Sequence, residues 1–391
     1  MKIKKILILG STGSIGKSTL KVIKNYQDKI KIVCMSSNKN FKKLYRQAQL
    51  FNVQNLIIND SNSFLKAKSF LRKKKINLFP SISEYLKKNK KKIDLTIIGI
   101  SGFEGLNPTL KIIPFTKSLA SANKESIICG WNFINSKLKK FKTKFIPIDS
   151  EHFSIWSLIK NDKHLISKIY LTASGGPFLN TSKKKLNYAD VKNVINHPNW
   201  SMGKKISTDS ATMMNKVFEV IEASKIFNLD VSKVKIIIHP KSIIHALVAF
   251  NNGIIKILMH ETKMEIPIFN IIFEKDNTNF YDKTVINFEK LNGINFIKPN
   301  KKKFPYLNIL SDYKIKNTYF EVILVTINDE LVNLFLNKKI SFINMQKLLI
   351  KLIKKSIFKK YYNKKPKNIS DINLMNNKVK KILINYDKIF Q

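Results

Sequence analysis

Two carboxylates, Asp149 and Glu151, stand two positions apart directly after the apolar run KFIPI at residues 144–148. If the backbone stays extended, side chains two positions apart point the same way, and both carboxylates converge at the carboxyl end of a strand. Acidic residues are scarce, at 26 against 71 basic ones. Paired carboxylates suit a hard cation such as Mg²⁺ or Mn²⁺, and a helix cap in a solvated turn is an equally good interpretation of this segment alone.

A second group of polar side chains falls on one face of a helix predicted from about Ser210 to Phe227. Asn215, Glu219 and Glu222 are spaced i, i+4 and i+7, so they share that face. Ser210 stands where the helix should begin, and a hydroxyl beside free N–H groups at a helix N-terminus forms an anion site. The helix would then bind a phosphate at its start and a metal through Glu219. Without the other segments, an ordinary amphipathic helix is slightly favoured.

Two loops carry further unusual residues. The small-residue turn TASGGPF at 172–178 can present Ser174 and backbone N–H groups to an anion. The loop HPNWSMG at 197–203 holds Trp200 and Met202 between proline and glycine. Apolar side chains in such a loop are typical of a lid over a ligand, although a plug of the core is an equal alternative.

A glycine turn follows the first apolar run, in GSTGSIGKST at residues 10–19. An ATP-binding P-loop needs a glycine five positions before Gly16, where this chain has Ser11. The spacing of Gly10, Gly13 and Gly16 between a strand and a helix instead favours a dinucleotide turn, in which helix N–H groups face a pyrophosphate. By itself this motif is weak.

The end of the second predicted strand indicates which dinucleotide binds. Enzymes that use NAD place an acid there to bond the ribose 2′-hydroxyl. This chain reads CMSSNKN at residues 34–40, with Lys39 and no carboxylate. The missing acid, more than the lysine, favours the 2′-phosphate of NADP.

The elements that would position these residues alternate between apolar runs and helical patterns over the first 150 residues. Strands are predicted at 6–9, 30–35, 55–59, 94–100, 118–122 and 144–148, with amphipathic stretches such as 17–25 and 41–51 between them. This rhythm predicts an α/β fold with a Rossmann-like, doubly wound parallel sheet over 1–148. Residues 149–278 read as an α+β catalytic domain with two β-like runs at 235–250 and 253–259, 279–302 as a linker, and 303–391 as a small helical domain.

The net charge of +45 raises the alternative of a nucleic-acid-binding protein. Nearly all the basic residues are lysines, however, because Arg46 and Arg72 are the only arginines. Arginine is the residue that recognises guanine and phosphate through paired hydrogen bonds. The lysines are spread along a chain also rich in isoleucine and asparagine, which indicates codon bias. Two cysteines and no apolar run of membrane-spanning length predict a cytoplasmic protein.

Read together, six segments resemble the 1-deoxy-D-xylulose 5-phosphate reductoisomerase family. They are GSTGSIG (10–16), SANKES (121–126), IPIDSEHFSIW (146–156), TASGGPF (172–178), HPNWSMGKKISTDSATMMNKVFEVIEA (197–223) and HPKSIIHALV (239–248). The run from 197 to 223 is long and highly specific. The resemblance implies an NADPH- and metal-dependent enzyme of the non-mevalonate isoprenoid pathway that rearranges and reduces its substrate to 2-C-methyl-D-erythritol 4-phosphate.

The resemblance also implies roles for matching residues. It places the cofactor against Thr12, Gly13, Ser14, Ile15, Asn38, Lys39, Asn40, Asn123, Glu125 and Gly203. It places the phosphorylated sugar against Ser150, Glu151, Ser174, His197, Trp200, Met202, Ser210, Asn215, Lys216 and Glu219. Asp149, Glu151 and Glu219 would bind Mg²⁺, Mn²⁺ or Co²⁺, with Glu222 nearby, and Lys124 would act with them on substrate oxygens.

Several positions depart from the family pattern without removing a metal or phosphate ligand. Asn38 replaces a glycine, Thr262–Glu265 stands where Pro-Asp-Met-Arg is usual, and 324–329 reads LVTIND where the family has Leu-Asn-Ala-Ala-Asn-Glu. The main hypothesis is therefore a working reductoisomerase, expected to be a homodimer with 235–259 as a candidate contact and to bind neither membrane nor specific nucleic acid. The alternatives are a polyanion-binding protein and an inactive relative of the same fold.

Overall fold

The computed structural model describes residues 3–200, 202–274, 276, 278–281, 288–313 and 316–387. Packing divides the chain into two units: residues 1–123, 134–156 and 263–285 form the first unit, and 124–133, 157–262 and 286–391 form the second. Because a unit describes packing and not independent folding, the three domains expected from the sequence stay a prediction. Parts of the predicted linker, lid and C-terminal domain, at 282–287, 201, 314–315 and 388–391, lie outside the described residues.

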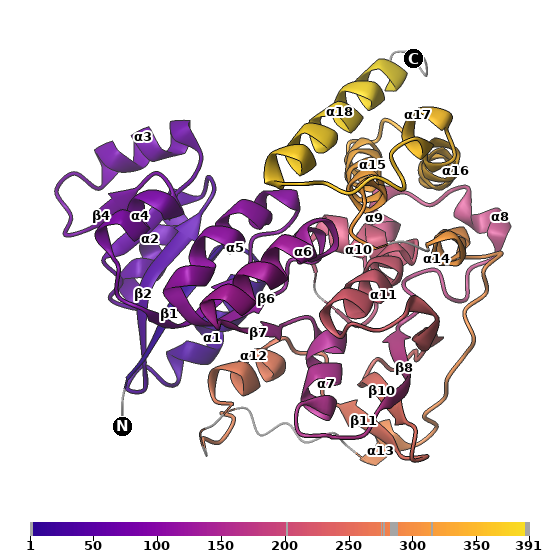
Figure 1. Ribbon diagram of the computed structural model, residues 1–391, viewed down its shortest axis with the longest axis horizontal. Coiled ribbons are helices and arrows are strands. Elements are labelled where there is room, and N and C mark those ends of the chain that lie inside the picture. The colour runs from indigo at the N-terminus through magenta and orange to yellow at the C-terminus, as the bar shows by residue number, and fades with distance from the viewer. Residues whose placement is uncertain are drawn as a thin grey trace. The chain divides into compact units, whose positions relative to one another are not determined.

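A parallel sheet of seven strands forms the centre of the first unit, in the order β4-β3-β2-β1-β5-β6-β7 (Figure 1). The strands are β1 Lys4–Leu9, β2 Ile30–Ser37, β3 Asn55–Ile58, β4 Asn77–Phe79, β5 Ile93–Ile98, β6 Thr116–Ser121 and β7 Lys144–Pro147. Their apolar runs are almost continuous because both faces of a parallel sheet are covered. The six predicted strands are confirmed. The three-residue β4 was missed because so short a run has no readable period.

Helices connect these strands and cover the sheet (Figure 1). They are α1 Ser14–Lys24, α2 Phe41–Leu50, α3 Ser61–Phe70, α4 Ile82–Lys88, α5 Leu106–Ile112, the last part of α6 Lys124–Phe141 and the first part of α7 Ser150–Ile159. Helix α12, Glu265–Ile272, also belongs to this unit and packs on α1. Tyr26 fixes that contact, with its ring 4.8 Å from the ring of Phe273. The core therefore includes chain that follows β1 by more than 200 residues.

The second unit has a sheet of four strands in the order β11-β10-β8-β9. Its strands are β8 Ile166–Ala173, β9 Val234–Ile238, β10 Ile244–Phe250 and β11 Ile255–Met259. The run predicted at 235–250 is two strands, because Pro240 and the positive φ of Ser242 turn the chain between them. Strand β8, which pairs with both β9 and β10, was not predicted.

The second unit also contains helices besides its parts of α6 and α7. They are α8 Lys183–Leu186, α9 Val191–Ile195, α10 Lys204–Ala211, α11 Met214–Ile226, α13 Phe288–Leu291, α14 Ile309–Asp312, α15 Tyr319–Leu336, α16 Phe342–Ile353, α17 Ser356–Lys359 and α18 Ile369–Asp387. The helical character expected after residue 303 is confirmed, with α15 packed against α16 and α18. A capping box starts α15, in which Thr318 and Glu321 exchange hydrogen bonds. Among the described residues, no helix is long and apolar enough to span a membrane.

Candidate active site

The glycine turn of the first unit joins β1 to α1 in the way a dinucleotide turn requires. Gly10 has a φ of +88°, which a side chain would strain, and a Cβ there would lie 2.7 Å from the Gly99 carbonyl oxygen. Helix α1 begins at Ser14 after an N-cap, Gly13, that offers no side-chain cap. Several backbone N–H groups at its start are therefore available to an anion. Lys17 and its neighbours lie inside this helix, which removes the P-loop interpretation.

Side chains from α2 hold this turn, and sequence reasoning missed them. Ser11 Oγ donates to Gln47 Oε1 at 2.8 Å, and Gln47 Nε2 donates back to the Ser11 carbonyl oxygen at 3.1 Å. Lys43 Nζ donates to the carbonyl oxygen of Thr12 at 3.3 Å, which brings an ammonium group beside the turn. In so lysine-rich a chain, no sequence signal distinguishes Lys43 from its neighbours.

The segment after β2 contains no carboxylate, and an acid from another segment lies close to it. The Asp60 backbone N–H donates to the Asn38 carbonyl oxygen at 3.2 Å, but the Asp60 carboxylate accepts the Ser63 N–H at 2.9 Å and caps α3. Asn40 caps α2 in the same way, through the Lys43 N–H. Lys39 is exposed beside them. The arrangement leaves a lysine and no uncommitted acid where a ribose 2′-substituent would be expected.

The acidic pair lies at the carboxyl end of β7, as expected, but the backbone there is not extended. Helix α7 begins at Ser150, and the Phe153 N–H donates to the Asp149 carbonyl oxygen at 2.7 Å. Asp149 thus precedes the helix and Glu151 lies in its first turn, so the expected extended backbone is wrong. The expected convergence is confirmed, because a carboxylate oxygen of Asp149 lies within 4.8 Å of one of Glu151. Ser150 Oγ donates to Glu151 Oε2 at 2.6 Å, and His152 Nδ1 lies 3.8 Å from Asp149 Oδ2. Both carboxylates stay beside the sheet edge.

In the second unit, the helix predicted from Ser210 to Phe227 is two helices. Met213, in a left-handed conformation with φ of 65°, separates α10 from α11. Ser210 lies in the last turn of α10, so the expectation that it stands at a helix N-terminus is wrong. Ser210 nevertheless lies against the small-residue turn at 172–178, because a Cβ at Gly176 would lie 3.1 Å from the Ser210 carbonyl oxygen.

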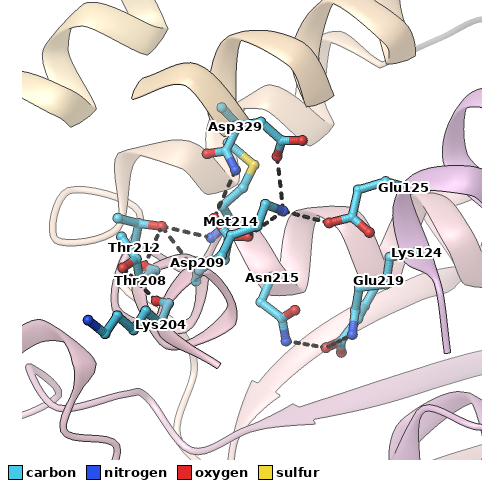
Figure 2. Close-up of polar contacts among 12 residues, drawn as sticks. Lys124, Glu125, Lys204, Thr208, Asp209, Thr212, Met214, Asn215, Glu219 and Asp329 are labelled. Carbon is cyan, nitrogen blue, oxygen red and sulfur yellow. Dashed lines mark hydrogen bonds and ion pairs between the residues drawn. The ribbon is translucent and has the colours of Figure 1, made fainter. Parts of the chain in front are cut away.

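The expected polar face of α11 is centred on Glu219, whose side chain is 1% exposed. Asn215 Nδ2 donates to Glu219 Oε1 at 2.5 Å, which confirms that these residues share a face (Figure 2). Lys216 Nζ lies 2.5 Å from Glu219 Oε2 and donates to the Thr172 carbonyl oxygen at 2.6 Å. Lys124 Nζ, from the start of α6, lies 3.6 Å from Glu219 Oε1. Two ammonium groups and an amide therefore surround one buried carboxylate.

Ser174 and His197 lie side by side in the wall of a groove of about 900 Å³, which is also lined by residues such as Phe178, Tyr188 and Pro240. Ser174 Oγ lies 3.0 Å from His197 Nε2 and accepts the Gly176 N–H. His197 Nδ1 accepts the Asn199 and Trp200 N–H groups, which assigns the proton of the neutral ring to Nε2. His197 therefore donates to Ser174.

Asn199, which was not among the predicted site residues, fixes the middle of the expected lid loop at 197–203 by hydrogen bonds. Asn199 Nδ2 donates to the Pro240 carbonyl oxygen at 2.8 Å and to Ser242 Oγ at 2.7 Å. Trp200 and Met202 are half-buried, and the Trp200 ring lies 5.9 Å from that of His245. Gly203 is exposed at the N-cap of α10.

The remaining expected cofactor residues stand at the end of β6. Asn123 Nδ2, in the first unit, donates to the carbonyl oxygens of Ile100 and Gly102. In the second unit, Glu125 Oε1 accepts a hydrogen bond from Lys205 Nζ at 2.5 Å. Lys205 also pairs with Asp209 and Asp329, so it joins three carboxylates.

Burial raises the pKa of Asp329 to about 7, beside the opposing Lys205 and the like-charged Glu125 and Asp209. The folded chain therefore holds the Asp329 proton more tightly than the unfolded chain does. The contribution of Asp329 to the free energy of unfolding should be greatest below its unfolded pKa of about 4 and should fall until the pH reaches about 7.

Urea unfolding of the unaltered chain and of Asp329→Asn across this pH range tests the expectation. The difference in free energy of unfolding should shrink as the pH rises to about 7 and stay level above it. Glu330→Gln, on the same helix, controls for loss of a more exposed carboxylate. A constant difference from acid to neutral pH would contradict the assignment.

A Rossmann-like sheet with a glycine turn and a second unit with a buried lysine–carboxylate site define a nucleotide-dependent enzyme. Family models of 1-deoxy-D-xylulose 5-phosphate reductoisomerase match residues 6–130, with its C-terminal domains at 145–227 and 259–382. The chain belongs to the 1-deoxy-D-xylulose 5-phosphate reductoisomerase family.

Relatives support the assignment over the full length. The reductoisomerase of Pelagibacter ubique is 52% identical over 380 residues, covering 96% of this chain and 97% of that protein. The reductoisomerase of Wolbachia sp. subsp. Drosophila simulans is 36% identical over 349 residues, covering 88% of each chain. A solved reductoisomerase from Zymomonas mobilis in complex with NADPH has a TM-score of 0.86 at 29% identity and 97% coverage of both chains. Another, in complex with NADPH, fosmidomycin and magnesium, has a TM-score of 0.91 at 27% identity and 99% coverage of both chains.

Proposed function

We propose that this chain catalyses the NADPH-dependent rearrangement and reduction of 1-deoxy-D-xylulose 5-phosphate to 2-C-methyl-D-erythritol 4-phosphate. The observation that carries the proposal is the buried Glu219 between Lys124, Lys216 and Asn215, next to the turn that bears Ser174. The matches over nearly the whole chain favour this enzyme over a polyanion-binding protein.

The glycine turn of the first unit fits NADPH. The open start of α1 and the small residues Thr12 to Ile15 suit a pyrophosphate, because N–H groups there lack side-chain caps. Lys39 and Asn40, with Asn38, are the proposed neighbours of the adenosine ribose phosphate. Asn123, Glu125 and Gly203 are proposed to lie along the rest of the cofactor.

Asp149, Glu151 and Glu219 are the proposed ligands of a divalent cation, Mg²⁺ or Mn²⁺. All three donors are carboxylates, which matches the preference of hard cations for oxygen. Glu219 is buried, and a buried carboxylate is stable only beside positive charge, which lysines and a bound cation both supply. Co²⁺ accepts the same donors.

Ser174, Ser210, Asn215 and Lys216 are the proposed holders of the substrate phosphate, with His197 orienting Ser174. Contacts with the phosphate, remote from the bonds that change, supply binding energy that orients the reacting end. Ser150 and Lys124 are proposed to contact the substrate, with Lys124 beside its oxygen atoms. Trp200 and Met202 would exclude water while the intermediate is bound.

When bound, the cation polarises the ketone and stabilises alkoxide charge during rearrangement of the carbon skeleton, and NADPH then supplies hydride to the resulting aldehyde. The chain's own part is to hold the substrate oxygens beside Lys124 and the phosphate beside Lys216. Because both ends of the substrate are held, the aldehyde would stay in place between the rearrangement and the reduction.

The decisive experiment combines the purified chain with 1-deoxy-D-xylulose 5-phosphate, Mg²⁺ and NADPH, and follows NADPH absorbance. We expect NADPH oxidation that stops when a chelator removes the cation, and 2-C-methyl-D-erythritol 4-phosphate as the product. A demonstrably folded sample that oxidises no NADPH would overturn the proposal. Tight binding to one nucleic-acid sequence at physiological salt would instead support the polyanion alternative.

Lys43 is expected to contribute to the choice of NADPH over NADH. Burial and the neighbouring Lys17 lower the pKa of Lys43, so a bound phosphate would relieve the repulsion between two ammonium groups. Lys43→Met should raise the KM for NADPH about tenfold, the effect of one charge-assisted hydrogen bond, and change the KM for NADH little. Lys42→Met, an exposed neighbour, is the matched control. Equal changes for both cofactors would show that Lys43 does not serve the 2′-phosphate.

A homodimer in the cytoplasm is also proposed. Strand β11 is the edge of its sheet and exposes Ile255 and Ile257, at 58% and 47%. An exposed apolar edge strand favours pairing with another chain, and a second copy would cover it. The molar mass in solution tests the proposal, and a monomer at micromolar concentration would contradict it.

A further inference from the structure

One ammonium group, that of Lys205 in α10, joins carboxylates from three separate helices. Its Nζ lies 2.5 Å from Glu125 Oε1 in α6, 3.2 Å from Asp209 Oδ2 in α10 and 3.0 Å from Asp329 Oδ1 in α15. Figure 2 shows Glu125, Asp209 and Asp329 around one nitrogen, with dashed lines from it. Asn328 Nδ2 adds a hydrogen bond to Asp209 Oδ1 at 2.8 Å. Of these residues, only Glu125 has a proposed role in the site, beside the cofactor.

Burial strengthens the ion pairs of Lys205 and keeps water from replacing them. The side chains of Glu125, Asp209 and Asp329 are 10%, 4% and 22% exposed. Although burial opposes ionisation, Lys205 holds the pKa of Glu125 below its ordinary value, so this carboxylate is charged. Removing the ammonium would leave the buried Glu125 carboxylate without its opposing charge, which is strongly unfavourable.

The contact to Glu125 also fixes the residue before it in the chain. Lys124 and Glu125 are the first two residues of α6, and neighbours in a helix point about 100° apart around its axis. Glu125 is held by Lys205 on one side, while Lys124 Nζ lies 3.6 Å from Glu219 Oε1 on another. A rotation of this turn that released Glu125 would move Lys124 away from Glu219.

We propose that Lys205 is a positioning residue for the reaction, which anchors the first turn of α6 through Glu125 and thereby keeps the ammonium of Lys124 beside Glu219. This inference rests on the proposed function. Lys205 acts through other side chains and contacts no reacting atom. Asp209 and Asp329 hold Lys205 in turn, so α10 and α15 serve as the fixed support.

The test compares Lys205→Met, Lys205→Arg, Glu125→Gln and the double variant Lys205→Met with Glu125→Gln. Lys205→Met should lower kcat about 100-fold, the scale of a misplaced catalytic group, with a smaller change in KM. Lys205→Arg should recover most of the loss, because it keeps the positive charge. In the Glu125→Gln background, Lys205→Met should cost much less, because the link is already broken. Lys204→Met, exposed and one residue earlier, should behave as the unaltered chain.

A crystal structure of Lys205→Met separates this inference from the proposed function. We expect Lys124 Nζ to leave Glu219 while α10 and α11 keep their places. If Lys124 stays at the present separation, or if the two substitutions lower kcat independently, positioning by Lys205 is refuted. If the unaltered chain shows no turnover but Lys124 moves in the variant, the proposed reaction fails and the positioning stands.

Discussion

Glu219→Gln is expected to reduce kcat about 10³-fold, while the chain stays folded. Glutamine has nearly the same shape, but it removes the negative charge that faces Lys124 and Lys216 and one of the three proposed cation ligands. Lys216 would keep its bond to the Thr172 carbonyl oxygen, so the local fold has a remaining anchor. Steady-state NADPH oxidation measures kcat, and Mn²⁺ titration measures the affinity for the cation.

Glu222→Gln is the matched comparison, because Glu222 is equally buried and lies one turn later on α11. Its substitution should lower kcat far less and leave Mn²⁺ affinity closer to that of the unaltered chain. Full turnover and unchanged Mn²⁺ affinity in Glu219→Gln would show that Glu219 is not a cation ligand.

Gly16→Ala is expected to destabilise the first unit by about 3 kcal/mol and to abolish NADPH binding. A Cβ at Gly16 would lie 2.4 Å from the Gly10 carbonyl oxygen and 2.4 Å from the Ser11 Cα. Both are backbone atoms of the turn proposed to cradle the pyrophosphate, so relief requires the turn to move. Denaturant unfolding and NADPH fluorescence titration measure the two effects.

Gly203→Ala controls for the loss of a glycine as such. A Cβ there meets nothing within 4 Å, and the free energy of unfolding should change by less than about 0.5 kcal/mol. If Gly16→Ala were as stable as Gly203→Ala, the close packing of α1 on the glycine turn would not be required for folding.

The sequence could predict most of the parallel sheet because its strands are buried on both faces and read as apolar runs. It could not predict β4, which is too short for a pattern, or β8, whose pairing with β9 and β10 depends on chain more than 60 residues away. Asn215 and Glu219 were predictable as neighbours because a helix has a fixed period. Local periodicity therefore predicts single helices and strands but not how distant strands pair.

The errors lay where the backbone changes direction. A left-handed residue at Met213 looks like any other position in a helical pattern, so the predicted helix ran through it and Ser210 was placed at the wrong end. For Asp149 and Glu151 the sequence leaves an extended segment and a helix start equally open, because no residue type near them marks the exact start of α7. In both cases the local backbone conformation, which the residue types do not reveal, decides which way a side chain points.

By itself, the sequence determined the class of the protein, because the residues proposed to bind a cofactor, a cation and a phosphate occur as ordered motifs. Only the tertiary structure decided what surrounds each of the many lysines. Lys43, Lys205 and Lys216 look alike in a chain of +45 net charge, and they differ in what folding brings to them. A side-chain type is a local property, whereas burial and the partners of a charge come from segments distant in the chain.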